Sequence, residues 1–235
     1  MTYHIEYENY QCDVIEAKNI EHATQIALER AHKMNTRVMR FTNGRTTMIK
    51  INLNVLMSAV LIAPKTDVRY YLNGIHISIN RVTSTDGHRL FTYDIKGTFE
   101  DGNDNQFCEE FASFIIPRDS IVQLNKSLTV KERRLAVVEI TENNGHYQMT
   151  CENSIVCFHP VDGKYPDVDR VIPKHYESKP HETYHWSYMN DFSKIAKLLG
   201  DKLGACRLIP NGNNSAIVSM PVDSNATCVI MPMRE

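Results

Sequence analysis

The sequence of 235 residues has almost no net charge and no long uninterrupted apolar run. The formal charge of −2 results from 26 Lys and Arg against 28 Asp and Glu. This balance excludes a globally basic protein that binds nucleic acid through bulk charge, but it allows a basic stripe on an acidic body. The longest apolar stretch, residues 53–63, contains Asn54 and Ser58 and is too short to span a bilayer. Glu6 and Glu8 stand where a signal peptide would need a basic start and an apolar core, so a cytoplasmic chain is expected.

The chain also lacks the cysteine and histidine spacing of a metal site. None of its cysteines forms a CxxC pair, and without a secretion signal they are expected to be reduced, mostly buried thiols. His181 and His185 are four residues apart, but no third ligand lies near them in the sequence. The polar stretch at 101–106, DGNDNQ, lacks the glutamate that closes a calcium loop, so a solvated loop is expected. No metal and no cofactor is therefore predicted. The cysteines are Cys12, Cys108, Cys151, Cys157, Cys206 and Cys228.

What is present is a normal globular composition. Hydrophobic residues make up 42% of the chain and charged residues 23%, which suffices for a core in one large or two small domains. Residues 1–47 are predicted to form a small strand–strand–helix–strand unit. Loose alternation over 2–17 indicates two short strands, 20–34 has the periodicity of a helix with one alanine-rich face, and 37–44 indicates a strand that enters an Asn-Gly turn.

From residue 48 onward, the order strand, helix and three strands occurs twice. In the first copy, a strand at 49–52 precedes a mostly apolar helix at 53–63, and paired strands flank a TDGH turn within 70–95. In the second copy, a strand at 111–117 ends at Pro117, where the next helix is predicted to open, because proline at the first helical position loses no useful N–H. Three more strands follow.

A third copy is predicted after a polar link. It has a strand at 183–188, a helix at 190–204 and three strands toward the end of the chain. A repeated strand–helix–three-strand module predicts an α+β fold assembled from equivalent units, with each helix on one face of a sheet.

Five segments resemble the bacterial beta sliding clamp family, the processivity subunit of DNA polymerase III. They occur in the order and at the separations that the family shows, and the resemblance covers about 48–235. The segments are DVRYYLNG (67–74), STDGHRLFTYDI (84–95), IIPRDSIVQL (115–124), VDGKYPDVDRVIP (161–173) and VIMPMRE (229–235).

The resemblance implies a shortened clamp. Residues 48–174 resemble the middle domain of the family, whereas 175–235 resemble the second half of its last domain. Residues 1–47 match no family segment. They either complete the C-terminal half-domain, so that three chains with two domains each close a ring, or they are an unrelated appendage and no ring closes.

A clamp implies duplex DNA as a partner, held without sequence readout. The hole needs a lining of positive potential, and phosphate contacts are nonspecific and salt-screened. The resemblance implies that Tyr70 and Tyr71 lie near DNA. Three lysines lie opposite the apolar stripes of two predicted helices and are candidate phosphate contacts: Lys126, Lys194 and Lys197. The helix at 53–63 has no basic residue and does not fit this role. The alternative is that the lysines are ordinary solvated side chains and the tyrosines are half-buried in a strand.

The resemblance also implies a hydrophobic pocket in which DNA polymerase and the clamp loader insert short peptides. Apolar side chains and methionines suit an adaptable cleft, and arginines at its rim can pair with acidic or amide groups of the peptide. Taken alone, TDGHRL would be a tight turn and MPMRE a frayed terminus. The pocket maps onto Leu72, Thr85, Gly87, His88, Arg89, Leu90, Pro166, Arg170, Val171, Met231, Pro232, Met233 and Arg234.

Catalysis is not predicted. Asp86, His88 and Asp94 could be imagined as an acid–base group, but no nucleophile or metal ligand is spaced to join them, and no phosphate-binding glycine loop is present. The sequence therefore predicts a homo-oligomeric sliding clamp. The alternative is a non-encircling protein that keeps the peptide pocket and recruits or sequesters replication proteins.

Overall fold

The computed structural model describes residues 2–7, 12–34, 38–42, 47–78, 80–95, 113–143, 146–174, 183–212 and 214–233. The chain divides into two compact units. The first comprises Met1–Met48 with Thr141–His146, and the second comprises Ile49–Ile140 with Tyr147–Glu235. Within the described residues, no helix has both the length and the apolar character needed to cross a membrane.

The first unit has the predicted order of strand, strand, helix and strand: β1 (Thr2–Tyr7), β2 (Cys12–Glu16), α1 (Ile20–Lys33) and β3 (Val38–Thr42). The strands form an antiparallel sheet in the order β2-β1-β3. The side chain of Asn19 caps α1 by accepting a hydrogen bond from the backbone N–H of His22. Because Ala23, Ala27 and Ala31 are buried, the helix packs closely on the sheet.

From residue 47 onward, mostly in the second unit, the chain forms two copies of a module in chain order and a third copy without an opening strand among its described residues. The first copy comprises β4 (Thr47–Asn52), α2 (Leu53–Ile62), β5 (Gly74–Ser78), β6 (Arg81–Thr85) and β7 (Arg89–Asp94). The second comprises β8 (Phe114–Pro117), α3 (Arg118–Ser127), β9 (Val137–Asn143), β10 (His146–Cys151) and β11 (Ser154–Phe158). The third comprises α4 (Trp186–Leu198), β12 (Arg207–Ile209), β13 (Ala216–Ser219) and β14 (Ala226–Ile230).

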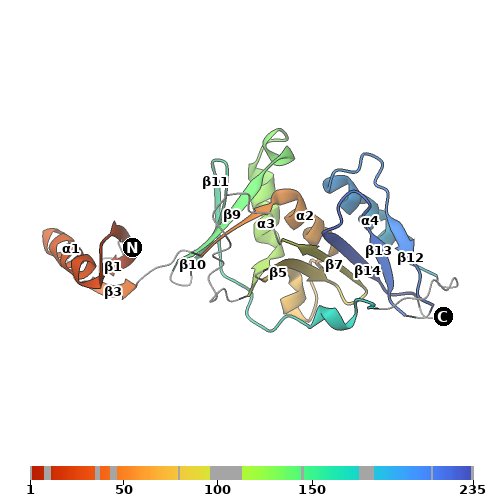
Figure 1. The fold of residues 1–235 in the computed structure, drawn as a ribbon, viewed down its shortest axis with the longest axis horizontal. Coiled ribbons are helices and arrows are strands. Elements are labelled where there is room, and N and C mark those ends of the chain that lie inside the picture. Colours follow the sequence, from red (N-terminus) through yellow and green to blue (C-terminus); the bar gives the residue numbers. More distant parts are fainter. Residues whose placement is uncertain are drawn as a thin grey trace. The chain divides into compact units, whose positions relative to one another are not determined.

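The first two modules exchange their opening strands. β4 lies beside β9 in a four-stranded sheet, β11-β10-β9-β4, while β8 pairs with β5 of the first module. The third module joins the first through antiparallel pairing of β14 with β7. The result is a seven-stranded sheet, β12-β13-β14-β7-β6-β5-β8, in which strands far apart in sequence lie side by side (Figure 1).

The core explains why α2 carries no basic residue. α2 contacts β5, β6 and β7 and lies between α3 and α4 (Figure 1), so most of its side chains are buried. Its polar Ser58 is also buried and donates a hydrogen bond from Oγ to the carbonyl of Asn54 at 2.7 Å. The predicted apolar stripe of α3, Ile121, Leu124 and Leu128, is buried in the same core.

Three sequence-based expectations about local structure are wrong. The strand predicted at 183–188 does not form, because α4 begins earlier than predicted, at Trp186, with His185 as its N-cap. Tyr70–Asn73 forms a 3-10 helix, η1, rather than the start of a strand. Pro117 is the last residue of β8 and occupies the N-cap position of α3, not its first helical position. The helix therefore begins one residue later than expected, at Arg118.

Candidate functional site

An apolar pocket of about 190 Å³ lies in the second unit where four segments meet. These segments are η1, the turn between β6 and β7, the stretch 166–171 and the end of β14. Most of the residues that the sequence assigned to a peptide pocket line it: Leu72, Thr85, Gly87, His88, Arg89, Leu90, Pro166, Val171 and Met231.

Strand pairing brings the two ends of this pocket together. Val229 of β14 is opposite Leu90 of β7, and the backbone N–H of Met231 donates to the carbonyl of His88 at 2.8 Å. The TDGH turn and the C-terminal methionine segment, about 140 residues apart in the sequence, therefore share one groove.

Three predicted residues do not line the pocket. Arg170 is 83% exposed in its side chain and pairs with Asp167. Met233 is exposed, and its N–H donates to the carbonyl of Thr183, while Pro232 is half-buried beside it. Arg234 lies outside the described residues.

The pocket contains further residues that the sequence had not assigned to it. Arg69 and Tyr71 belong to the segment DVRYYLNG, and Val229 belongs to VIMPMRE. These residues could therefore have been assigned to the pocket from the segments that resemble the family. Asp167 and Val168 lie in VDGKYPDVDRVIP between residues that were assigned.

The β6–β7 turn is shaped by Asp86. Its Oδ1 accepts hydrogen bonds from the backbone N–H groups of His88 and Arg89, each at 2.9 Å. Gly87 adopts a φ of +90°, a left-handed conformation that glycine tolerates best. The carboxylate of Asp86 therefore stabilises the turn. Asp94, the other carboxylate of the imagined acid–base group, forms an ion pair with Arg81.

The arginines at the pocket are paired with aspartates of the same chain. The Arg69 guanidinium donates hydrogen bonds that lower the pKa of Asp67 to about 2. Arg89 is 11% exposed in its side chain and pairs with Asp86 at 2.9 Å and with Asp191 of α4 at 2.6 Å. Burial lowers the pKa of Arg89, but these two carboxylates outweigh it, so the net pKa is raised. Of the arginines expected to meet a peptide, Arg89 and Arg170 are therefore already paired with aspartates.

The candidate DNA-contacting residues are placed on several elements. Tyr70 is 56% exposed, and Tyr71 is half-buried at the pocket, with the two rings edge to face at 5.8 Å. The alternative of a strand position is wrong for this pair, because both residues lie in η1, although Tyr71 is half-buried. Lys126 is exposed on α3, and Lys194 and Lys197 are exposed on α4. Lys194 Nζ pairs with Asp191 Oδ1 at 2.8 Å.

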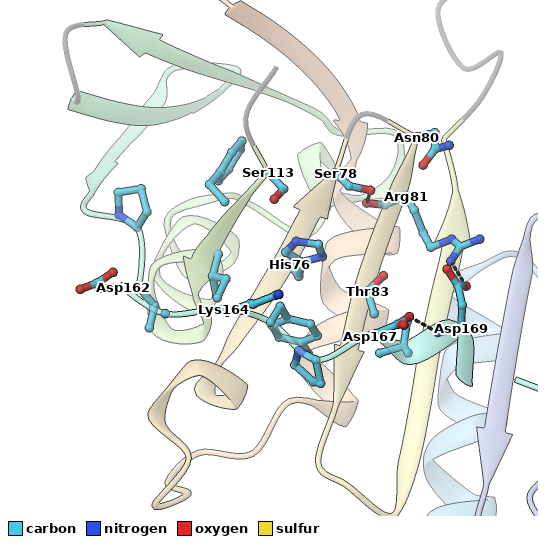
Figure 2. Close-up of a pocket in the computed structure, with 18 of the residues that line it drawn as sticks. His76, Ser78, Asn80, Arg81, Thr83, Ser113, Asp162, Lys164, Asp167 and Asp169 are labelled. Atoms are coloured by element: carbon cyan, nitrogen blue, oxygen red, sulfur yellow. Dashed lines mark hydrogen bonds and ion pairs between the residues drawn. The ribbon is translucent and has the colours of Figure 1, made fainter. Parts of the chain in front are cut away.

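A second cavity, of about 910 Å³, is drawn in Figure 2 and shares lining residues with the apolar pocket. Ile75 and Ile77 of β5 point into the core, so His76 and Ser78 face the cavity from the opposite face of the sheet. The ring of Tyr165 stacks on His76 at 4.9 Å between centroids. Burial lowers the pKa of His76. The sequence did not predict this cavity.

A thin segment separates the two cavities. Pro166, Asp167 and Val168 line both of them, so one stretch of chain is a wall of each. Figure 2 shows Asp169 beside Arg81 at one end of the larger cavity, and their ion pair at 2.6 Å fixes that end of the segment to β6.

Within the part of the chain that the structure describes, no group of three or more His, Cys, Asp or Glu side chains is arranged to hold a metal ion. His185 caps α4 through Nδ1, which accepts a hydrogen bond from the Ser187 N–H. His181 and the loop at 101–106 lie outside the described residues, as does Cys108. Cys151 and Cys228 are buried free thiols, Cys206 is a half-buried free thiol, and Cys157 is an exposed one.

Residues 48–167 match the model of the DNA polymerase III beta subunit, central domain. The beta sliding clamp of Pseudomonas putida is 37% identical over 112 residues, which are 46% of this chain and 28% of that protein. The beta sliding clamp of Escherichia coli K12 is 30% identical over 157 residues, 65% of this chain and 40% of that protein. The matched part thus spans less than half of these relatives.

Solved structures of sliding clamps share the fold. A clamp from Bartonella birtlesii superposes with a TM-score of 0.64 at 16% identity, covering 95% of this chain and 74% of that one. A clamp from Pseudomonas aeruginosa gives a TM-score of 0.58 at 18% identity, covering 98% of this chain and 76% of that one.

Proposed function

The chain belongs to the DNA polymerase III beta subunit family, and from this membership we propose that it acts as a DNA sliding clamp, a processivity factor that encircles duplex DNA. It has the α+β clamp fold with repeated modules. The observation that carries the proposal is the groove shared by the TDGH turn and the C-terminal methionine segment, because it forms only when the third module docks on the first.

The pocket suits a short hydrophobic peptide. Leu72, Leu90 and Val229 are buried at its base, and Met231 is 39% exposed at its edge. A volume of about 190 Å³ admits anchoring side chains but no folded element. The proposed partners at this site are DNA polymerase and the clamp loader, each through a peptide of this kind.

The proposed grip on DNA is topological and involves no bond chemistry, so no enzymatic activity is part of the proposal. Lysines that face the duplex would contact phosphates without reading bases, which permits sliding. Lys126, Lys194 and Lys197 are the described candidates, together with Tyr70 and Tyr71. The site of action with the replication machinery is proposed to be the cytoplasm.

A ring requires more than one chain. In the proposed organisation, 48–174 is one clamp domain, 175–235 is half of another, and 1–47 either completes that half or is an appendage. In the first case a homo-oligomer is required, since the two clamp domains of one chain cannot enclose a duplex, whereas in the second case no ring closes.

Retention on closed DNA tests the proposal. The full chain, loaded on a plasmid by a bacterial clamp loader, should co-elute with nicked circular DNA in gel filtration and be lost after the plasmid is cut once. Equal retention on circular and linear DNA would contradict encirclement. The mass in solution distinguishes the alternative, because a strict monomer at micromolar concentration that still binds the peptide would be a non-encircling adaptor.

A further inference from the structure

Asp191 of α4 holds two cations that belong to different parts of the second unit. Its Oδ2 accepts a hydrogen bond from Arg89 Nη1 at 2.6 Å, and its Oδ1 accepts one from Lys194 Nζ at 2.8 Å. Arg89 lines the apolar pocket, whereas Lys194 lies on the exposed face of α4 and is 51% exposed in its side chain. One carboxylate thus connects the pocket to a candidate phosphate contact.

The Arg89 side chain, which connects Asp191 to the pocket, is held in place by several contacts. Its Nε also pairs with Asp86, and its guanidinium carbon lies 4.4 Å from the ring centroid of Tyr188 on α4. Asp86 in turn accepts hydrogen bonds from the turn that presents Gly87 and His88. Asp191 does not line the pocket, but through Arg89 it sets the position of the wall that does.

We propose that Asp191 is the positioning residue of the peptide pocket, and that it couples peptide binding there to anion binding at Lys194. This inference rests on the proposed function, since it takes the peptide and DNA as the ligands. When a phosphate draws Lys194 away, Asp191 faces Arg89 alone and holds it more firmly. A wall that is already ordered lowers the entropic cost of binding, so the peptide binds more tightly. The coupling is reciprocal, and the peptide strengthens DNA binding by the same factor.

The size of the effect is modest. A partly exposed ion pair contributes little, so DNA should tighten peptide binding by only roughly two- to threefold. Loss of the Asp191 charge should change peptide affinity more than DNA does, because it removes a hydrogen bond between charged groups, one of which, Arg89, is largely buried. Asp191→Asn should weaken peptide binding by about tenfold.

The experiment is a fluorescence anisotropy titration of the full chain with a labelled hydrophobic clamp-binding peptide from a DNA polymerase III. It is performed at constant ionic strength, without DNA and with a saturating short duplex. The variants are Asp191→Asn, Lys194→Gln and, as a control, Lys202→Gln, which removes an exposed lysine just past the end of the same helix. Lys194→Gln should bind the peptide as tightly as the wild type does with DNA, and DNA should add nothing. Lys202→Gln should keep the response to DNA.

Each result decides the inference. Peptide affinity that DNA leaves unchanged in the wild type, or an equal response in Lys194→Gln, would overturn it. So would wild-type affinity in Asp191→Asn. If Asp191→Asn fails to fold by circular dichroism, the Lys194→Gln response still decides, and a purely structural role for Asp191 predicts no such response. A wild-type chain that binds neither peptide nor duplex would overturn the proposed function, and the inference with it, whereas normal binding without coupling would overturn the inference alone.

Discussion

The backbone N–H of Thr85 donates a hydrogen bond to the phenol oxygen of Tyr165, with 3.0 Å between nitrogen and oxygen. Thr85 precedes the turn that forms one wall of the pocket, and Tyr165 precedes the segment that forms another. The Tyr165 side chain is almost fully buried, and burial raises the pKa of its phenol, so the group stays neutral. One bond therefore fixes the separation of two pocket walls.

Replacing Tyr165 with Phe should lower the free energy of unfolding by about 1–2 kcal/mol. The ring and its packing remain, but the Thr85 N–H loses its acceptor, and a part-buried donor without a partner is costly. Urea denaturation followed by circular dichroism measures the difference. Tyr70→Phe is the matched control, since its ring is 56% exposed, and it should change stability by less than about 0.5 kcal/mol. Equal losses in the two variants would refute the role of this bond.

His76 should make the second unit less stable in mild acid. Burial lowers its pKa, so the folded state resists a proton that the unfolded chain accepts near the ordinary histidine pKa of about 6.5. The stabilisation is complete above that pH and is lost as the pH falls through the folded-state pKa. His76→Phe keeps the stack on Tyr165 without the titration, so its stability should depend less on pH between about 7.5 and 5.

Urea denaturation at several pH values provides the measurement. The exposed His88, replaced by Gln, serves as the control and should leave the pH dependence of the wild type unchanged. A His76→Phe variant with the same loss of stability in acid as the wild type would show that another group is responsible.

The modules were predictable because local periodicity and turn signals agree with the fold between residues 48 and 160. The apolar run of α2 and the stripe of Ile121, Leu124 and Leu128 fixed both helices. The start of α4 was not predictable from alternation, since Tyr184, Trp186 and Tyr188 mimic a strand, whereas the cap at His185 begins a helix. The exchange of β4 and β8 between the first two modules was not predictable either, because no local sequence pattern indicates which distant strand each one pairs with.

The pocket was predicted through the resemblance, not through chemistry. The sequence contains the arginines near it, but their aspartate partners lie up to 102 positions away, as with Arg89 and Asp191. The larger cavity was missed for the same reason. His76 and Tyr165 meet only because the chain crosses the outer face of the sheet, and no short-range pattern encodes that path.

Gly87 should be intolerant of a side chain for two separable reasons. Its φ of +90° disfavours any L-residue, and a Cβ would lie 2.9 Å from Nη1 of Arg69, whose Nη2 donates to the Asp86 carbonyl. Gly87→Ala should cost about 1–2 kcal/mol of stability from the backbone alone and should also weaken peptide binding. Gly200→Ala isolates the backbone cost, because its φ is +113° but its nearest neighbour is at 3.8 Å.

Urea denaturation and peptide anisotropy of the two glycine variants distinguish these causes. Gly200→Ala should lose stability and keep peptide affinity, whereas Gly87→Ala should lose both. Unchanged peptide affinity in Gly87→Ala would mean that the position of Arg69 does not matter to the site.

Met231 should be an energetic centre of the proposed peptide site. It is partly exposed at the pocket, and its N–H is held by His88, so truncation removes apolar contact without disturbing β14. Met231→Ala should weaken binding of a short clamp-binding peptide by about tenfold, near 1.4 kcal/mol, with stability little changed. The control is Met233→Ala, which is exposed and outside the pocket lining. Equal affinity of the wild type and Met231→Ala, measured by fluorescence anisotropy, would argue against this site.

Lys126 should contribute to DNA binding through phosphate alone. It is exposed in the last turn of α3, and no ion pair of its side chain is found within the described part of the chain. Lys126→Gln should therefore weaken binding to a short duplex equally for all sequences. The slope of log affinity against log salt should fall by about one, because one phosphate contact is lost. Lys164→Gln is the control, since Lys164 lies at the larger cavity across the sheet from α2. Equal weakening in both variants would indicate attraction to total charge rather than a DNA-facing α3.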